Sequence, residues 1–459
     1  MATIGFVSLG CDKNRINCEQ MLYRLMEAGY EILDTPELAE VVIINTCAFI
    51  ESARSETIEN ILEIARAKVE NRDPDGMGGN VRKIIVTGCL AERYRDEIFA
   101  ELPEVDGLVG CGSFDDIVAA VEDALAGERV SRYGDIDAPL TEQSRVLISD
   151  PYSAYLIIAE GCSNRCAYCV IPSIRGKYRS RAFDDVVAEA QGLAEMGTKE
   201  LILVAQDLTL FGIDTDGRRR LPELLDALAS IDGIEWIRLH YLYPEGITDE
   251  LIDAIKRNPK VLRCLDIPIQ HINNKILKAM RRRSSGEGIR ELFTKLRREL
   301  EGVVLRTSII IGLPGEGEAE FEELCDFLRD YRLERAGFFR FSPEEGTPAA
   351  EMPDQPDEET VTRRMETVEA IQMKIMDDYN TALVGKIVDV IFEGTDEIIK
   401  YSYGRTYADA PDIDGKVFFK HQAALQPGNI VEVLIDEAMD GDLFGRALAK
   451  LSDRREAGQ

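Results

Sequence analysis

The sequence contains no apolar run long enough to cross a membrane, no basic leader at its start, and no internal repeat or low-complexity stretch. A spanning helix needs about 20 consecutive apolar residues, and a secretory signal opens with positive charges that residues 1–7 lack. We therefore expect a protein of the cytoplasm that does not enter a membrane. Ten cysteines in 459 residues are also too few for a disulfide scaffold. In a reducing compartment, clustered cysteines more often bind metal or do chemistry.

Basic residues are scarce relative to acidic ones. The chain has 54 Lys and Arg against 84 Asp and Glu, which gives a formal net charge of −30. Because nucleic-acid binding depends largely on Lys and Arg that displace phosphate counterions, this balance does not favour RNA, and a basic protein partner is easier. With 45% hydrophobic and 30% charged residues the composition is globular, and 459 residues suggest two or three domains.

Residues 1–135 have the pattern of a doubly wound α/β domain. Apolar runs lie at 4–9, 41–46 and 84–87, and helical spacing lies between them at 15–28 and 51–69. Parallel sheets produce this alternation because each crossover between strands needs a helix. The Gly-rich segment 71–80 is expected to be a surface loop. We predict an N-terminal parallel-sheet domain with helices on both faces.

Residues 148–380 repeat the alternation of strands and helices. Strands are expected at 155–159, 201–205, 236–240, 264–268, 304–311 and 337–341, and helices at 184–196, 249–256, 273–282 and 318–329. A closed eight-unit barrel takes about 250 residues, so six units indicate an incomplete (β/α)6 barrel with one side open to a large substrate. A long helix should then tie the barrel to the tail, with one apolar face formed by Val361, Met365, Val368, Ile371, Ile375 and Tyr379.

The tail, residues 381–455, changes to short alternating strands separated by glycine turns. Two examples are 385–392 and 428–435. Short strands at this spacing are typical of a small all-β barrel. The sequence therefore predicts three domains, at 1–135, 148–380 and 381–455.

The sharpest local feature is Cys162-Ser-Asn-Arg-Cys166-Ala-Tyr-Cys169, directly after the first strand of the second domain. Three thiolates on one loop can hold three irons of a four-iron, four-sulfur cube, whose usual complement is four cysteines. The fourth iron is then open to a small molecule. The alternative is structural zinc, which usually takes paired Cys-x-x-Cys units and four protein ligands, and no second pair occurs nearby.

Three further cysteines, Cys11, Cys47 and Cys89, each follow an apolar strand of the first domain. In an open parallel sheet those positions lie along the carboxyl edge, where ligands bind, so a second three-thiolate site becomes possible. Any one of them alone could be an ordinary buried cysteine. Cys111 also follows a short strand-like run, and spacing does not exclude it. We interpret Cys18, Cys264 and Cys325 as structural.

The three-cysteine loop resembles that of the radical S-adenosylmethionine superfamily, in which an aromatic residue, here Tyr168, precedes the last cysteine. The resemblance implies that this cluster reduces S-adenosylmethionine to methionine and a deoxyadenosyl radical. Gly312 and Gly315 match a late-strand glycine motif that lets the backbone approach the cofactor. Gln206 stands where the second strand should meet the methionyl end of the cofactor.

An N-terminal three-cysteine domain, a radical barrel and a small β-barrel together resemble the methylthiotransferase family across nearly the whole chain. The resemblance selects Cys11, Cys47 and Cys89 as ligands of an auxiliary 4Fe-4S cluster, besides the 4Fe-4S cluster at Cys162, Cys166 and Cys169, and it leaves Cys111 outside the motif. Seven segments look like the branch that modifies an aspartate of small-subunit ribosomal protein S-twelve. They are 8–14, 158–162, 171–181, 205–209, 239–244, 267–271 and 341–348.

That branch implies two uses of S-adenosylmethionine. One molecule donates a methyl group to sulfur held at the auxiliary cluster, and the other yields a radical that takes hydrogen from the β-carbon of the aspartate. The carbon radical then captures the methylthio group and returns an electron to the auxiliary cluster. The sulfur donor and the electron donor are not identified by the sequence.

The charge of the tail points to the same branch. Residues 381–459 contain 14 Asp and Glu against 9 Lys and Arg, although their pattern resembles the RNA-binding TRAM barrel. Such a surface suits a cationic ribosomal protein better than RNA, and a merely solvated acidic face accounts for part of the excess. Arg175, Lys177, Arg179 and Arg181 could face the substrate carboxylate, or form an ordinary charged strand edge. Two alternatives stay open: a transfer RNA methylthiotransferase, and a non-catalytic iron–sulfur redox protein.

Overall fold

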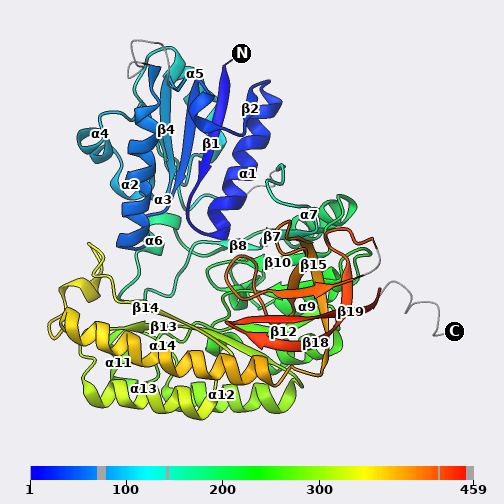
Figure 1. Ribbon diagram of the computed structural model, residues 1–459. Coiled ribbons are helices and arrows are strands. Elements are labelled where there is room, and N and C mark those ends of the chain that lie inside the picture. The colour runs from blue at the N-terminus through cyan, green and yellow to red at the C-terminus, as the bar shows by residue number, and fades with distance from the viewer. Residues whose placement is uncertain (1, 70–78, 141–143, 422–423, 451–459) are drawn as a thin grey trace.

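The computed structural model describes residues 2–69, 79–140, 144–421 and 424–450. Three sheets follow one another along the chain, and Figure 1 shows the N-terminal sheet above the barrel with the tail packed beside the barrel. Most of the loop predicted at 71–80 lies outside the described residues. Within those ranges, no helix is long and apolar enough to span a membrane.

The N-terminal sheet has six parallel strands in the order β2-β1-β3-β4-β5-β6. Their bounds are β1 Thr3–Ser8, β2 Glu31–Leu33, β3 Val41–Thr46, β4 Lys83–Gly88, β5 Gly107–Val109 and β6 Val130–Arg132. The helices are α1 Asp12–Glu27, α2 Glu51–Arg66, α3 Cys89–Tyr94, α4 Glu97–Glu101 and α5 Ile117–Leu125. This strand order is that of an open doubly wound sheet, which binds ligands at its carboxyl edge.

Alternate side chains of β3 bury into two different cores. Val42 and Ile44 pack with α2 and α3, whereas Val41 and Ile43 pack with α1 and α5. Successive side chains of a strand point to opposite faces, so a strand that is apolar throughout needs a helix layer on each side. The predicted doubly wound fold is confirmed.

The second sheet has six parallel strands in the order β14-β13-β12-β11-β10-β7 and does not close. Its strands are β7 Ser153–Ile157, β10 Glu200–Val204, β11 Trp236–Leu239, β12 Val261–Asp266, β13 Val304–Ile311 and β14 Arg335–Arg340. The helices that follow the strands include α7 Phe183–Glu195, α9 Leu221–Ala229, α10 Asp249–Arg257, α11 Asn274–Ala279, α12 Gly286–Glu299 and α13 Glu318–Tyr331. The predicted incomplete (β/α)6 barrel is therefore confirmed.

Short elements after β7 carry the three-cysteine loop of the barrel. They are the two-stranded sheet of β8 Ala159–Glu160 and β9 Arg179–Ser180, and the short helix α6 Ile171–Arg175. Another short helix, α8 Ile213–Asp216, follows β10. These pieces lie at the carboxyl ends of the barrel strands, where barrel enzymes place their active sites.

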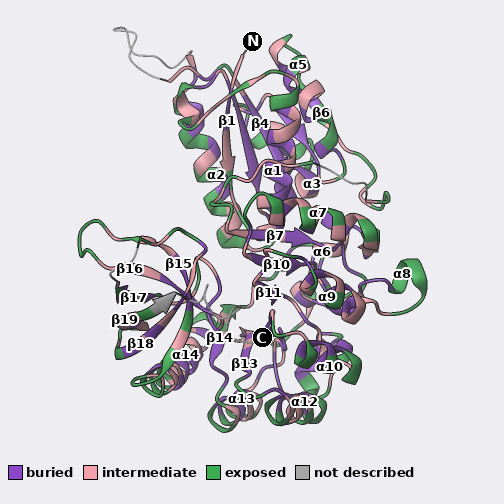
Figure 2. Ribbon diagram, turned by 90° about the vertical axis from the view of Figure 1, so that its right-hand side faces the viewer, coloured by how far each residue is buried: buried purple, intermediate pink, exposed green. Residues whose placement is uncertain are grey.

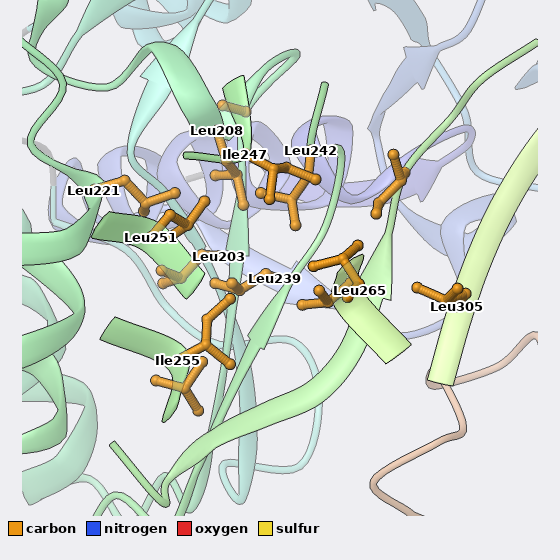
Figure 3. Close-up of a cluster of buried hydrophobic side chains, with 14 of the residues drawn as sticks. Leu203, Leu208, Leu221, Leu239, Leu242, Ile247, Leu251, Ile255, Leu265 and Leu305 are labelled. Atoms are coloured by element: carbon orange, nitrogen blue, oxygen red, sulfur yellow. The ribbon is translucent and has the colours of Figure 1, made fainter. Parts of the chain in front are cut away.

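Leucines from neighbouring barrel strands form one apolar layer with the covering helices. Leu203 of β10 pairs in register with Leu239 of β11, and Leu265 of β12 pairs with Leu305 of β13. All four side chains belong to one buried cluster. In Figure 3, Leu203 lies beside Leu251 of the helices, and Leu265 and Leu305 continue the cluster on the far side of Leu239. Full burial of each such side chain is worth about 1.5–3 kcal/mol, so this layer holds the strand ends in fixed positions.

The long helix α14 Glu358–Thr381 connects the barrel to the tail. Val361, Val368 and Ile375 are buried on one face at seven-residue intervals, and Met365 and Ile371 pack against the barrel core. The predicted apolar face is confirmed. In Figure 2 the outward side of this helix is exposed, as an amphipathic surface helix requires.

The tail forms a closed barrel in the order β15-β16-β17-β19-β18. Its strands are β15 Ile387–Thr395, β16 Ser402–Thr406, β17 Val417–Lys420, β18 Ile430–Met439 and β19 Asp442–Lys450. Val390, Phe392, Phe419 and Val433 fill the interior. The predicted small β-barrel is confirmed, while the domain limits at 135, 148, 380, 381 and 455 stay predictions.

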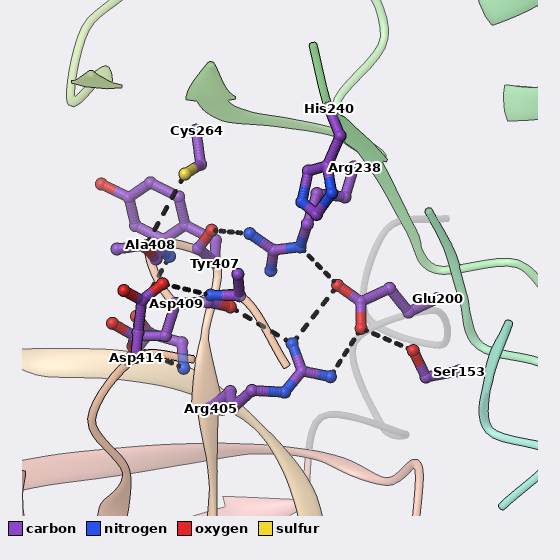
Figure 4. Close-up of polar contacts among 12 residues, drawn as sticks. Ser153, Glu200, Arg238, His240, Cys264, Arg405, Tyr407, Ala408, Asp409 and Asp414 are labelled. Atoms are coloured by element: carbon purple, nitrogen blue, oxygen red, sulfur yellow. Dashed lines mark hydrogen bonds and ion pairs between the residues drawn. The ribbon is translucent and has the colours of Figure 1, made fainter. Parts of the chain in front are cut away.

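A buried ion cluster joins the tail to the barrel (Figure 4). Glu200 of β10 accepts from Arg405 Nη2 at 2.6 Å and from Arg238 Nε at 2.8 Å, and all three side chains are at most 2% exposed. Burial alone would raise the pKa of Glu200, but the two guanidinium groups outweigh burial and lower the pKa to about 2. Glu200 is therefore charged in the folded protein near neutral pH.

We expect Arg405→Gln to lower the free energy of unfolding by about 3–5 kcal/mol, because Glu200 keeps its buried charge with one cation fewer. Urea denaturation of wild type and variant measures the difference. Folding depresses the pKa of Glu200 from 4.5 to about 2. The difference in free energy of unfolding between wild type and variant should therefore be full above pH 4.5 and should decline as the pH falls toward 2.

Arg446→Gln is the control, because Arg446 forms an exposed pair with Asp436 at 3.7 Å. This substitution should lower the free energy of unfolding by less than about 1 kcal/mol. Equal losses in the two variants would contradict this account of the junction.

Candidate active site

Backbone hydrogen bonds fix the cysteine loop of the barrel on both sides. The amide of Cys162 donates to the carbonyl of Gly176 at 3.0 Å, and the amide of Ala167 donates to the carbonyl of Met280 at 3.0 Å. Cys162 and Cys166 are buried, and Cys169 is partly buried. The structure thus brings the three predicted cysteines together at the carboxyl end of β7.

The environment of this loop opposes free thiolates. Burial raises the pKa of Cys169 to about 12, the amide of Ile171 lowers it, and the neighbouring Cys166 and Cys162 raise it again. Burial likewise raises the pKa of Cys162. Because iron binds the thiolate, metal binding has to supply the free energy that ionises these groups.

Two side chains beside the loop were not foreseen from the sequence. Arg282 Nη1 donates to Cys166 Sγ at 3.9 Å, and Tyr243 Oη lies 3.9 Å from the same sulfur. The Arg282 guanidinium also stacks over the Tyr243 ring at 4.4 Å. Both residues come from loops after other strands, so only the fold could place them here. They surround one sulfur with a cation and a hydroxyl.

The second cysteine set lies at the carboxyl edge of the N-terminal sheet, as predicted. Cys11 precedes α1, Cys47 follows β3, and Cys89 begins α3 after β4. Gly10 has φ 94°, and a side chain there would place its Cβ 2.8 Å from Cys47 Cβ. The β1 and β3 loops therefore touch. Burial raises the pKa of Cys47 to about 12, and the neighbouring Cys89 and Cys11 add to the rise.

Cys111 lies beside Cys89 in the structure. The spacing along the sequence had not excluded Cys111 as a ligand of this site. Their thiols share a hydrogen bond, and the amide of Cys111 donates to Glu92 Oε2 at 2.9 Å. This hydrogen bond is the largest effect on Cys89 and, with the Arg175 cation, outweighs burial and lowers its pKa to about 6. Burial and the same hydrogen bond raise the pKa of Cys111. Geometry therefore leaves both residues as possible ligands at this edge.

Asn14 ties the strand-end loops of this sheet together. Its side-chain Nδ2 donates to the backbone carbonyls of Leu9 at 2.9 Å and Thr46 at 2.8 Å. The backbone carbonyl of Asn14 accepts a hydrogen bond from Asn45 Nδ2 at 2.6 Å. The side chain is fully buried. These bonds hold the segments before Cys11 and Cys47 at a fixed separation.

Only one of the four alternating basic residues lies among the cysteines. Arg175 Nη2 donates to Cys89 Sγ at 3.5 Å, and its Nη1 is 3.5 Å from Glu160 Oε2. Lys177 is 79% exposed and faces Asp137 at 3.6 Å. Arg179 also faces Asp137, at 3.8 Å, while Arg181 pairs with Glu189. Lys177 is thus an exposed surface charge, and Arg179 and Arg181 are largely buried and paired with carboxylates, so Arg175 alone of the four donates to a cysteine.

Gln206 has an unsatisfied group that suits a cofactor amine. Its Nε2 donates to Glu160 Oε1, while its buried Oε1 has no hydrogen-bond donor among the residues that the structure describes. An unpaired buried acceptor costs about 1–3 kcal/mol. A ligand ammonium group would remove that cost, so the residues present fit S-adenosylmethionine.

The other predicted cofactor residues have contacts of their own. Tyr168 packs at the edge of the apolar cluster of Ala167 and Met280, next to the cysteines. Gly312 has φ 85°, and a Cβ there would lie 2.7 Å from Val361 of α14. The packing of α14 therefore gives this glycine a structural role as well. Gly315, with φ 81°, faces open space, with Lys275 Cε 4.0 Å away.

The arrangement of the thiols argues against a site for a single zinc ion. In the described part of the chain, no three His, Cys, Asp or Glu side chains gather closely enough to hold a single metal ion. Each thiolate of a four-iron cube binds a different iron, so its ligands stand farther apart than those of one zinc ion.

The two domains are clamped together around the site. Arg54 of α2 and Arg93 of α3 both pair with Glu344, in the loop after β14, and the Arg93 contact is 2.6 Å. A cavity of about 170 Å³ is lined by Cys111, Arg175 and Glu160. Another of about 510 Å³ opens beside Cys166 and Cys169. Space for small molecules thus adjoins the barrel cysteines, and a smaller cavity lies beside Cys111 and Arg175.

Three family models match consecutive parts of the chain. The Radical SAM superfamily matches residues 156–328, the Uncharacterized protein family UPF0004 matches residues 3–110, and the TRAM domain matches residues 384–448. Among solved structures, the radical S-adenosylmethionine methyltransferase TsrM from Kitasatospora setae has a TM-score of 0.55 at 15% identity, covering 76% of this chain and 75% of that one. The cobalamin-dependent enzyme OxsB has a TM-score of 0.51 at 13% identity, covering 81% and 56%. These likenesses show the fold.

The barrel and its cysteine loop define a radical S-adenosylmethionine enzyme. Two curated relatives narrow the class. Ribosomal protein uS12 methylthiotransferase RimO of Clostridium botulinum (strain Langeland) is 44% identical over 98% of this chain and 99% of its own length. The enzyme of the same name from Pelotomaculum thermopropionicum is 47% identical over 97% and 99%. The chain belongs to the RimO family of methylthiotransferases, as the sequence motifs predicted.

We expect Cys89→Ala to lose one of two clusters after anaerobic reconstitution, so that iron per chain falls by about half. Cys111→Ala should keep the full iron content, because the family motif uses Cys89 and not its neighbour. Iron and acid-labile sulfide analysis of both variants beside wild type makes the comparison. Loss of a cluster from Cys111→Ala but not from Cys89→Ala would reverse the ligand choice.

Proposed function

We propose that this chain adds a methylthio group to the β-carbon of an aspartate in ribosomal protein uS12. The observation that carries the proposal is the full-length match to RimO enzymes, together with the two cysteine sets of this chain. Two separate three-thiolate sites at facing sheet edges support it. A protein that only passes electrons has no need for open iron positions at both sites.

Each cysteine set has a separate role in the proposal. Cys162, Cys166 and Cys169 hold the cluster that binds S-adenosylmethionine, and Cys11, Cys47 and Cys89 hold the auxiliary cluster. When bound, the two clusters and S-adenosylmethionine supply the radical and the methylthio group. The protein provides the separation and the water exclusion: Asn14 and Arg175 fix the auxiliary edge, and Arg282 and Tyr243 pack against Cys166.

The electrostatics favour a protein substrate over RNA. The chain carries a net charge of −30, and residues 381–459 have 14 acidic against 9 basic residues. Part of the basic complement is already used, because Arg405 pairs inside the junction with Glu200 and Glu393. RNA binding needs basic residues that displace phosphate counterions, and few remain on the tail. The net negative charge of the tail instead attracts a cationic ribosomal protein.

The direct test is anaerobic incubation of the reconstituted protein with S-adenosylmethionine, a reductant and a sulfide source. Purified uS12 and transfer RNA are offered in parallel, and both are examined by mass spectrometry. We expect methylthio addition on an aspartate of uS12 and none on RNA, together with deoxyadenosine formation. Addition to adenosine would establish the transfer RNA reaction instead, and absence of deoxyadenosine would make the protein a non-catalytic redox protein.

We assign Gln206, Tyr168, Gly312 and Gly315 to the S-adenosylmethionine site. The unpaired Oε1 of Gln206 makes it the residue with most to gain from the ligand amine. A hydrogen bond to a charged group is worth about 1.5–3 kcal/mol, so Gln206→Ala should weaken S-adenosylmethionine binding by about 10- to 150-fold.

Isothermal titration of the reconstituted variants with S-adenosylmethionine measures this change. Gln372→Ala is the matched control, because Gln372 is also buried with an unpaired Oε1 but lies on α14 against the Leu333 carbonyl. It should bind as wild type does. Equal affinities for Gln206→Ala and wild type would remove Gln206 from the site.

A further inference from the structure

The Arg175 side chain joins the cysteine edge of the N-terminal sheet to Glu160, which lies just before the barrel cysteine loop. Its Nη2 donates to Cys89 Sγ at 3.5 Å and to Asn14 Oδ1, and its Nη1 donates to Asn17 Oδ1 at 2.8 Å. On the barrel side, Nη1 is 3.5 Å from Glu160 Oε2. Glu160 stands two residues before Cys162. The side chain of Arg175 is 4% exposed, so these groups replace water as its partners.

A guanidinium in this position is a permanent positive charge. Arginine keeps its proton in proteins, and a charge removed from water acts strongly on its neighbours. Hydrogen bonds to cluster sulfurs, together with the charge and solvent exposure around a cluster, set its reduction potential. A fixed cation and an N–H donor at Cys89 both stabilise the reduced form, which carries one more negative charge.

We propose that Arg175 is a positioning residue that raises the reduction potential of the auxiliary cluster through its hydrogen bond to Cys89 Sγ and its buried charge. The inference rests on the proposed function, because it takes Cys89 as a ligand of that cluster. Asn14, Asn17 and Glu160 hold the planar fork of the guanidinium in one orientation. A lysine keeps the charge but has no such fork, so it reproduces only part of the effect.

Arg145 provides a matched control. Its side chain is 3% exposed and also links the N-terminal domain to the barrel, through Glu19 of α1 at 2.9 Å and Glu189 of α7 at 2.9 Å. Its Nη2 donates to the carbonyl of Tyr155 at 2.6 Å. Removing either arginine leaves buried carboxylate charge between the domains, but only Arg175 donates to a cysteine of the site.

The test uses the full-length chain with Cys162→Ala, Cys166→Ala and Cys169→Ala, which leaves only the auxiliary cysteines. Arg175→Gln, Arg175→Lys and Arg145→Gln are added singly, and each protein is reconstituted anaerobically. The midpoint potential of the remaining cluster is measured by redox titration with EPR detection. We expect Arg175→Gln to shift the reduction equilibrium at least tenfold toward the oxidised form, which is about 59 mV for one electron. Arg175→Lys should give a smaller shift, and Arg145→Gln none.

The outcomes separate this inference from the proposed function. If the parent without the three barrel cysteines binds no cluster, the proposed function fails at its ligand assignment. If it binds a cluster and Arg175→Gln leaves the potential unchanged, or Arg145→Gln shifts it equally, the role of Arg175 is wrong. Loss of the cluster from both Arg175 variants but not from Arg145→Gln would also contradict the proposal, because Arg175 would then serve assembly alone.

Discussion

Two sheet edges that face each other across a domain junction set the position of every side chain in the site. In a parallel sheet all strands end on the same side, so residues far apart in the sequence meet there. Cys11, Cys47 and Cys89 meet at the edge of the N-terminal sheet, and the Cys162 loop leaves the corresponding edge of the barrel. Without the contacts that hold these edges opposite each other, the two thiol sets would be separate metal sites with no shared chemistry.

The contacts across the junction are buried and charged, which makes them costly unless every partner is present. Glu344 forms ion pairs with Arg54 and Arg93, and Glu160 forms an ion pair with Arg175. Hydrogen bonds of Asn14 hold the loops on the N-terminal side together. The thiols add a second cost, because burial raises the pKa of Cys47 and Cys169 to about 12. Iron binding turns this cost into a gain, since it is linked to ionisation of the thiols and binds only the folded arrangement.

Much of this architecture was predictable from the sequence, and the reasons are local. The strand at 41–46 was predicted with its observed bounds, because a strand buried on both faces begins as a run of apolar residues. The strand at 304–311 was also predicted with its observed bounds, from the apolar residues at its two ends. The three-residue strands β2 and β6 were not predicted, since three residues show no periodicity, and β5 was recognised only as a short strand-like run before Cys111. The spacing of the barrel cysteines indicated one cluster, whereas the choice of Cys11, Cys47 and Cys89 for a second came from the family resemblance.

The polar frame of the site was not predictable, because it depends on pairs that are distant in the sequence. Arg175 and Cys89 are 86 residues apart, and Arg282 and Cys166 are 116 apart. In the sequence, Arg175 is one of several alternating basic residues with Lys177 and Arg179. Only the structure shows that Arg175 is buried whereas Lys177 is exposed. Gly312 packs so closely against Val361 that a larger residue would not fit there. The resemblance to a cofactor motif had not suggested this packing role. The contact between Cys89 and Cys111 likewise required the sheet.

If the two clusters lie close enough to share one reaction, they interact magnetically, and this interaction can be measured. The EPR spectrum of the fully reduced wild-type protein is compared with the sum of the spectra of two variants, one lacking the barrel cysteines and one lacking Cys11, Cys47 and Cys89. The account predicts a wild-type spectrum that is broadened or split relative to that sum, because two nearby paramagnetic clusters couple. A wild-type spectrum equal to the sum would place the clusters too far apart to share a reaction and would contradict it.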